Sequence, residues 1–112
     1  MIEDPISWRE PWYPVEDANL RAAIQAELAR EVGPLHPLRE TEPVVIGKRD
    51  DCDDVVVSLS NHRFAIVHLV WHGGIDHYSD QFPRTRIFDG IDALQQALDI
   101  DNDDWAVGEG SA

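Results

Sequence analysis

Apolar residues recur at helical spacing in the first third of the chain. These positions, four residues apart, are Leu20, Ile24, Leu28 and Val32. Ala, Gln, Glu and Arg, which favour helices, occupy most of the positions between them. Gly33 and Pro34 follow directly, and such a pair is typical of a helix end. The pattern predicts a helix over residues 15–32.

The middle of the chain shows a different pattern, with short runs rich in Val and Ile. These runs cover residues 43–49, 54–60 and 63–71, and a shorter one covers residues 85–89. The connections between the first three runs are too short for the crossover helix that parallel strands need. The runs therefore predict an antiparallel sheet of three to four strands, arranged as a meander.

Helical spacing returns after residue 89. Ile91, Leu94 and Leu98 form one apolar stripe, and Asp89 is of a residue type that caps the start of a helix. The predicted order is helix, antiparallel sheet, helix, which is the pattern of an α+β fold. We expect both helices to cover the same face of the sheet.

Length and composition fit a single domain over residues 1–112. A chain of 112 residues with 43% apolar residues is long enough for one core and too short for two. The Pro-rich, aperiodic start predicts an irregular arm over residues 1–13, whose aromatic side chains are available to dock on the domain. Small residues near the other end predict a frayed tail over residues 106–112.

Alternation along the third predicted strand assigns its side chains to the two faces of the sheet. One face carries Phe64, Ile66, His68 and Val70, and the other carries Ala65, Val67, Leu69 and Trp71. Both faces are largely apolar, which is typical of a central strand covered on both sides. We therefore expect His68 to be buried and neutral.

Three histidines at and after the end of this strand raise the question of a metal site. His68 and His72 are about 13 Å apart along a regular strand, which is too far for them to share one ion. The alternative ligand set is His72 and His77 with Asp76 or Asp80, and its spacing matches no known zinc pattern. We therefore expect neither a metal nor another cofactor.

Two clusters of aspartates invite a calcium interpretation. Residues 99–104 place acids at the first, third and fifth positions of an EF-hand-like loop, but Asp104 stands where the glycine is needed. Residues 50–54 lie in a predicted hairpin, where aspartate favours the turn. We favour a solvated acidic turn there, and a weak divalent-cation site is the alternative.

Charge narrows the classes of partner. The chain has 22 acidic and 9 basic side chains, a formal net charge of −13. Nucleic-acid phosphates and anionic lipids repel such a chain, so we expect no nucleic acid and no membrane as partner, and we expect a basic protein. The lone Cys52 favours a reducing cytoplasm, and the aspartates around it make its thiol a poor nucleophile. The oligomeric state is not encoded in any of these patterns.

Four short motifs between residues 36 and 85 carry a family resemblance. They are "HPL" at 36–38, "RDDCDDVVV" at 49–57, "FAIVHLVW" at 64–71 and "FPRT" at 82–85. Together they resemble a family of small uncharacterised bacterial proteins with an Arg-Asp-Asp-x-Asp-Asp hairpin and an Ala-Val-Val-His-Leu-Thr-Trp-like strand. The resemblance implies a single bacterial domain, and it transfers no catalytic residue.

The hairpin and the loop after the central strand supply the candidate binding residues. They are Arg49, Asp50, Asp51, Asp53, Asp54, Trp71, His72, His77 and Tyr78. Arg and Trp are favoured at interfaces, and the net charge suits electrostatically steered association. We therefore expect a protein-binding module, such as an immunity or antitoxin-like inhibitor of a basic partner. The alternative is a small metal-dependent or acid/base enzyme that uses residues 72–80.

Overall fold

The structure is a computed structural model that describes residues 6–32, 38, 40–69 and 84–110. Its elements, in chain order, are β1 (Trp12–Pro14), α1 (Ala18–Glu31), β2 (Val44–Arg49), β3 (Asp54–Ser58), a 3-10 turn (Ser60–His62), β4 (Phe64–His68), β5 (Arg84–Phe88) and α2 (Ile91–Gly110). The five strands form one antiparallel sheet in the order β1-β2-β3-β4-β5. The predicted α+β fold with a meander between two helices is confirmed.

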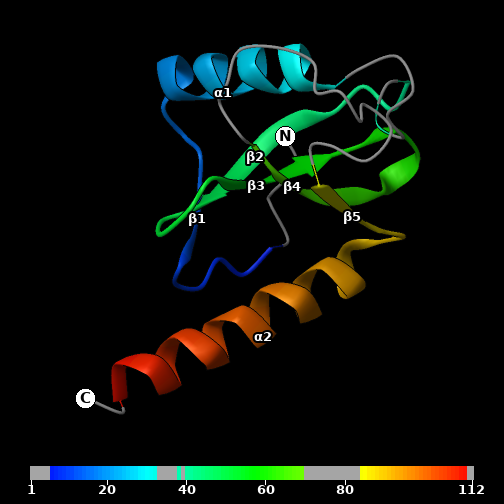
Figure 1. The fold of residues 1–112 in the computed structure, drawn as a ribbon. Helices are drawn as coiled ribbons and strands as arrows, with labels where there is room; N and C mark the ends of the chain where they lie inside the picture. The colour runs from blue at the N-terminus through cyan, green and yellow to red at the C-terminus, as the bar shows by residue number, and fades with distance from the viewer. Residues whose placement is uncertain (1–5, 33–37, 39, 70–83, 111–112) are drawn as a thin grey trace.

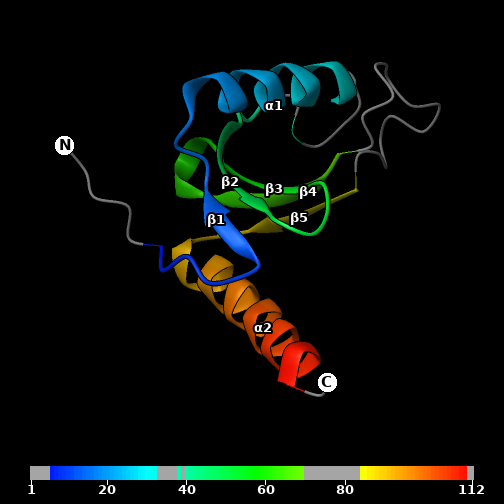
Figure 2. The same cartoon turned by 90° about the vertical axis from the view of Figure 1, so that its left-hand side faces the viewer.

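The sheet lies between the two helices, with α1 over one face and α2 over the other (Figures 1 and 2). The expectation that both helices cover one face is therefore wrong. Alternation along β3 gives the reason, since Val55 and Val57 pack with α1 while Val56 packs with α2. Two helices on one face would leave the opposite set of apolar side chains in water.

Helix α1 starts later than the sequence predicted because Asp17 caps it. The Asp17 carboxylate accepts hydrogen bonds from the backbone N–H groups of Asn19 and Leu20, at 2.8 and 3.1 Å. Such a cap satisfies backbone donors that have no partner inside the helix. Ile24 and Leu28 are buried against the sheet, whereas Leu20 is 37% exposed and lies outside the core.

The N-terminal segment lies against α2. Gln95 of α2 exchanges two hydrogen bonds with the backbone of Ser7, at 2.8 and 3.0 Å. Asn102 donates to the carbonyl of Glu10 at 2.7 Å. The chain then enters the sheet as β1, where Trp12 pairs with Arg49. The last part of the predicted arm is therefore an edge strand, which the Pro-rich sequence did not indicate.

Helix α2 is longer than its apolar stripe. Leu94 and Leu98 are fully buried, but the helix continues to Gly110 and so includes most of the residues expected to fray. The fraying of residues 106–112 stays a prediction. Among the described residues, no helix combines the length and the apolar character that crossing a membrane requires.

Gly47 provides a test of how the N-terminal segment packs. A Cβ atom at this position would overlap the indole ring of Trp8, which packs on the α2 side of the sheet. We expect Gly47→Ala to lower the free energy of unfolding by about 1.5 kcal/mol, because the ring must move. The measurement is urea denaturation followed by circular dichroism.

Gly90→Ala is the matched control, since nothing lies within 4 Å of a Cβ atom at that position. We expect this variant to unfold within about 0.5 kcal/mol of the parent. Equal losses for the two variants would contradict the close approach of Trp8 to Gly47.

Candidate functional site

Hydrogen bonds to its own backbone stabilise the acidic hairpin between β2 and β3. The Nζ atom of Lys48 donates to the backbone carbonyls of Arg49 and Cys52, at 3.0 and 2.8 Å. The N–H group of Asp50 donates to the carbonyl of Pro11 at 2.7 Å, which joins the hairpin to the N-terminal segment. The side chains of Asp50 and Asp53 are left exposed on the hairpin.

Arg49 joins this hairpin to α2. Its Nε atom lies 2.6 Å from an oxygen of Asp51, and its Nη1 atom lies 3.5 Å from an oxygen of Asp101. The guanidinium also lies 5.8 Å from the centre of the Trp12 ring, within cation–π range. The hydrogen bond from Arg49 keeps the pKa of Asp51 below its usual range. Two of the predicted binding residues, Arg49 and Asp51, are thus engaged with each other.

The last aspartate of the hairpin sequence contacts a histidine. Asp54 begins β3 and pairs across the sheet with His68, the last residue of β4. An oxygen of Asp54 lies 2.6 Å from the Nδ1 atom of His68. An ionised carboxylate only accepts hydrogen bonds, so Nδ1 carries the hydrogen, and neutral His68 has its lone pair at Nε2.

The expectation that His68 is buried is wrong, because its side chain is 52% exposed. Ile66, on the same face of β4, is 3% exposed and packs with Leu94 and Leu98 of α2. The apolar cover ends before the end of the strand is reached. The sequence shows the alternation along β4, but it does not show where a helix from elsewhere in the chain stops covering the face.

His68 and Asp54 open onto a hollow of about 240 Å³ at this end of the sheet. Its other lining residues are Ile66, Thr85 and Arg86. The Arg86 guanidinium lies 5.9 Å from the centre of the Phe88 ring. Sequence reasoning did not single out Arg86, because its place beside His68 depends on the register of β5 against β4, which no sequence pattern fixes.

The outward side of α2 forms a second surface, the acidic face, made of Asp92, Asp103 and Asp104. All three are exposed, and the helix contains no Lys or Arg. Ile100, which is 54% exposed, lies within the same stretch of helix. The C-terminal part of α2 runs away from the sheet in both views of the fold (Figures 1 and 2).

Not every acid of α2 belongs to this face. Asp99 lies 3.5 Å from Arg9 and accepts a hydrogen bond from Gln95 at 3.0 Å. Asp101 accepts a hydrogen bond from the indole Nε1 of Trp12 at 3.0 Å and lies beside Arg49. The cluster at residues 99–104 is therefore split between internal partners and solvent.

The remaining predicted binding residues, Trp71, His72, His77 and Tyr78, lie outside the described residues. The same holds for Asp76 and Asp80, so the predicted loop site and the enzyme alternative stay predictions. Within the described parts of the chain, no group of three or more His, Cys, Asp or Glu side chains is arranged to hold a metal ion.

Cys52 lies in the hairpin and is partly exposed. Burial, and then the charges of Asp54 and Asp51, raise the pKa of its thiol. The thiolate is the reactive form of cysteine, so this environment disfavours a nucleophilic role. The sequence suggested the effect of the aspartates but not the contribution of burial.

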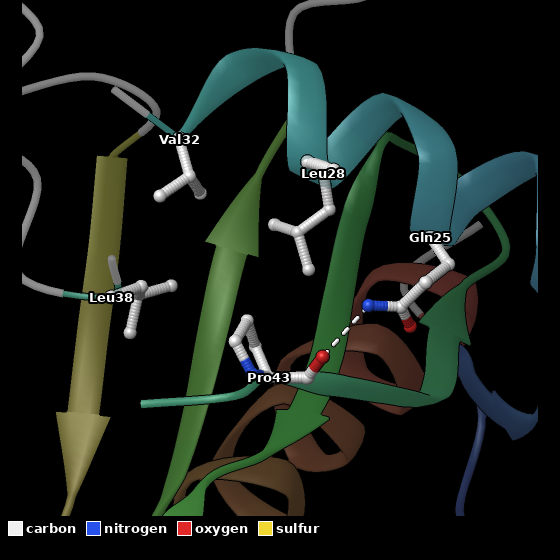
Figure 3. Close-up of a pocket in the computed structure, with 6 residues that line it drawn as sticks. Gln25, Leu28, Val32, Leu38 and Pro43 are labelled. Carbon is white, nitrogen blue, oxygen red and sulfur yellow. Dashed lines mark hydrogen bonds between the residues drawn. The ribbon is translucent and has the colours of Figure 1, made fainter. Parts of the chain in front are cut away.

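A second hollow, of about 180 Å³, lies between α1 and the start of β2 (Figure 3). Its lining residues are Gln25, Leu28, Ala29, Val32, Leu38 and Pro43. Gln25 is the polar one, and both ends of its amide are used, because it donates to the carbonyl of Pro43 at 2.7 Å and accepts from the N–H group of Val45 at 3.0 Å. Gln25 therefore fixes β2 beneath α1.

Comparison of the chain with protein-family models, with curated proteins and with solved structures finds no match. The family resemblance suggested by the four motifs stays a prediction.

Proposed function

We propose that this protein is a protein-binding module of the cytoplasm that presents the acidic face of α2 to a basic protein partner, as an immunity or antitoxin-like inhibitor does. The observation that carries the proposal is the exposure of Asp92, Asp103 and Asp104 on a helix without a single Lys or Arg. Uncompensated charges on one surface steer the encounter with an oppositely charged partner.

The pairing of the other acids supports this choice of surface. Asp99 and Asp101 have cationic neighbours within the molecule, Arg9 and Arg49, each at 3.5 Å. Their fields are partly cancelled at short range, so they contribute less to a long-range potential. The exposed Ile100 offers apolar contact area beside the acids. A rim of charge around an apolar contact is the usual anatomy of an interface.

The test requires a partner, which a pull-down with the full chain from the native host supplies. We expect a basic protein, whose association with the purified module is then followed by stopped-flow fluorescence at several salt concentrations. Replacing Asp92, Asp103 and Asp104 with Asn is expected to slow association about fivefold to tenfold at low salt and to flatten its salt dependence. Dissociation is expected to change less, because steering acts on the encounter.

The control variant removes the same number of charges elsewhere, by replacing Glu16, Glu40 and Glu42 with Gln. All three are exposed and lie outside α2. We expect this variant to associate within about twofold of the parent. A captured partner that is not basic, or an equal slowing of both variants, contradicts the proposal.

A further inference from the structure

The register of β4 against β5 brings His68 and Arg86 to the same face of the sheet. Ile66 is opposite Arg86, and His68 is two residues beyond Ile66 on β4. Side chains in such diagonal positions are about 7–8 Å apart at the backbone, within reach of each other's ends when they are long. Both residues line the hollow of about 240 Å³.

The hydrogen-bonding capacity of these two side chains is only partly used by the residues that the structure describes. The Nδ1 atom of His68 is taken by Asp54 at 2.6 Å, and this bond fixes the ring while leaving Nε2 available. Arg86 forms no ion pair with any of the described residues, and its guanidinium rests near the Phe88 ring at 5.9 Å. By contrast, Arg9, Arg30 and Arg49 each have a carboxylate neighbour.

An anion fits this arrangement better than a cation does when the His68 ring is protonated, because the imidazolium then offsets the Asp54 carboxylate in the same hollow and Arg86 adds a further positive charge. A divalent cation beside His68 and Asp54 would stand close to the permanent positive charge of Arg86, and the described residues offer no third ligand. An oxyanion accepts hydrogen bonds from the guanidinium fork and from a protonated imidazole. The buried side chain of Ile66 forms an apolar wall that strengthens these contacts.

The size of the hollow limits the ligand. Pockets for drug-sized molecules are about 300–1,000 Å³, so a hollow of about 240 Å³ accommodates a small ligand or one group of a larger one. We propose that the hollow formed by Asp54, His68 and Arg86 binds a small oxyanion, a carboxylate or a phosphate, between the imidazole and the guanidinium.

The experiment follows the ring signals of His68 by NMR at pH 6.5 while sodium phosphate is added to the full chain at constant ionic strength. Sodium acetate is the second arm. We expect the chemical shifts of the His68 ring to change with anion concentration until they reach a plateau. His62 is exposed and does not line the hollow, so its ring signals are expected to show no such saturation. Saturation with phosphate alone indicates that the ligand carries a phosphoryl group, and saturation with acetate alone indicates a carboxylate. Saturation with both anions indicates a site that recognises the oxyanion chemistry they share.

Arg86→Gln tests the guanidinium directly. We expect this variant to bind the saturating anion at least about tenfold more weakly, because a charge-assisted pair of hydrogen bonds is lost. Arg63→Gln is the matched control, since it removes one positive charge at the opposite end of β4, and we expect its affinity to change less than about twofold.

The amide fingerprint spectrum of each variant is the control that the sheet is intact. Arg86→Lys keeps the positive charge but loses the guanidinium fork, so it is expected to bind the anion with intermediate affinity. Two results would overturn the proposal. One is the absence of saturation with both anions. The other is an unchanged affinity in folded Arg86→Gln.

Discussion

Replacing Leu98 with alanine is expected to lower the free energy of unfolding by about 3 kcal/mol. Leu98 is fully buried and belongs to the core cluster that joins α2 to the sheet through Val56 and Ile66. The substitution removes buried apolar atoms and leaves a cavity that the rigid sheet cannot fully close. Urea denaturation followed by circular dichroism measures the loss.

Ile100→Ala is the matched control, two residues further along the same helix. Ile100 is 54% exposed, so its truncation is expected to change the free energy of unfolding by no more than about 0.5 kcal/mol. Helix propensity favours alanine over both leucine and isoleucine, so it does not explain a difference between the variants. Similar losses for the two variants would mean that α2 does not pack on the sheet through its Leu98 side.

Periodicity in the sequence was sufficient to predict the elements of the fold but not their layering. The four Val- and Ile-rich runs and the two helical stripes correspond to β2, β3, β4, β5 and the two helices. The face that each helix covers depends on connections and on packing between distant residues, which a periodic pattern does not contain. The two apolar faces of β3 and β4 were the available signal that one helix must lie on each side.

The candidate site was predictable only in part for the same reason. The sequence indicated the hairpin aspartates as candidate binding residues and predicted a buried His68, whereas the structure brings Asp54 and His68 into contact. It could not indicate that Arg49 faces α2, because Asp101 lies far away along the chain. Arg86 was missed because residues 69–83 separate β4 from β5, and a connection of that length does not fix the register of the strands.

The two proposed sites follow from how the chain distributes its few cations. Arg9 and Arg49 lie beside Asp99 and Asp101 on the inner side of α2, and the exposed acids of the outer side form no ion pair with the residues that the structure describes. Arg86 instead forms no ion pair among the described residues, although Asp54 lines the same hollow. The Asp54 carboxylate in this hollow is engaged by His68, so the Arg86 guanidinium is the charge there that has no ion-pair partner among the described residues, and it attracts an anion locally.

The largest loss of stability is expected for Trp12→Ala, at about 4 kcal/mol. Trp12 is 2% exposed and lies where the N-terminal segment, β2 and α2 meet. Its indole donates to Asp101 at 3.0 Å, and the Arg49 guanidinium lies 5.8 Å from its ring. The substitution thus removes a large buried ring, a hydrogen bond to a carboxylate and a cation–π contact together.

Trp12→Phe separates these contributions. The phenyl ring keeps most of the apolar volume and a weaker cation–π contact, but it cannot donate a hydrogen bond to Asp101. We expect it to lower the free energy of unfolding by about 1–2 kcal/mol, because Arg49 still lies 3.5 Å from that carboxylate. Both variants are measured by urea denaturation followed by circular dichroism, since tryptophan emission itself changes. A loss below about 1 kcal/mol for Trp12→Ala would show that the N-terminal segment contributes little to the stability of the domain.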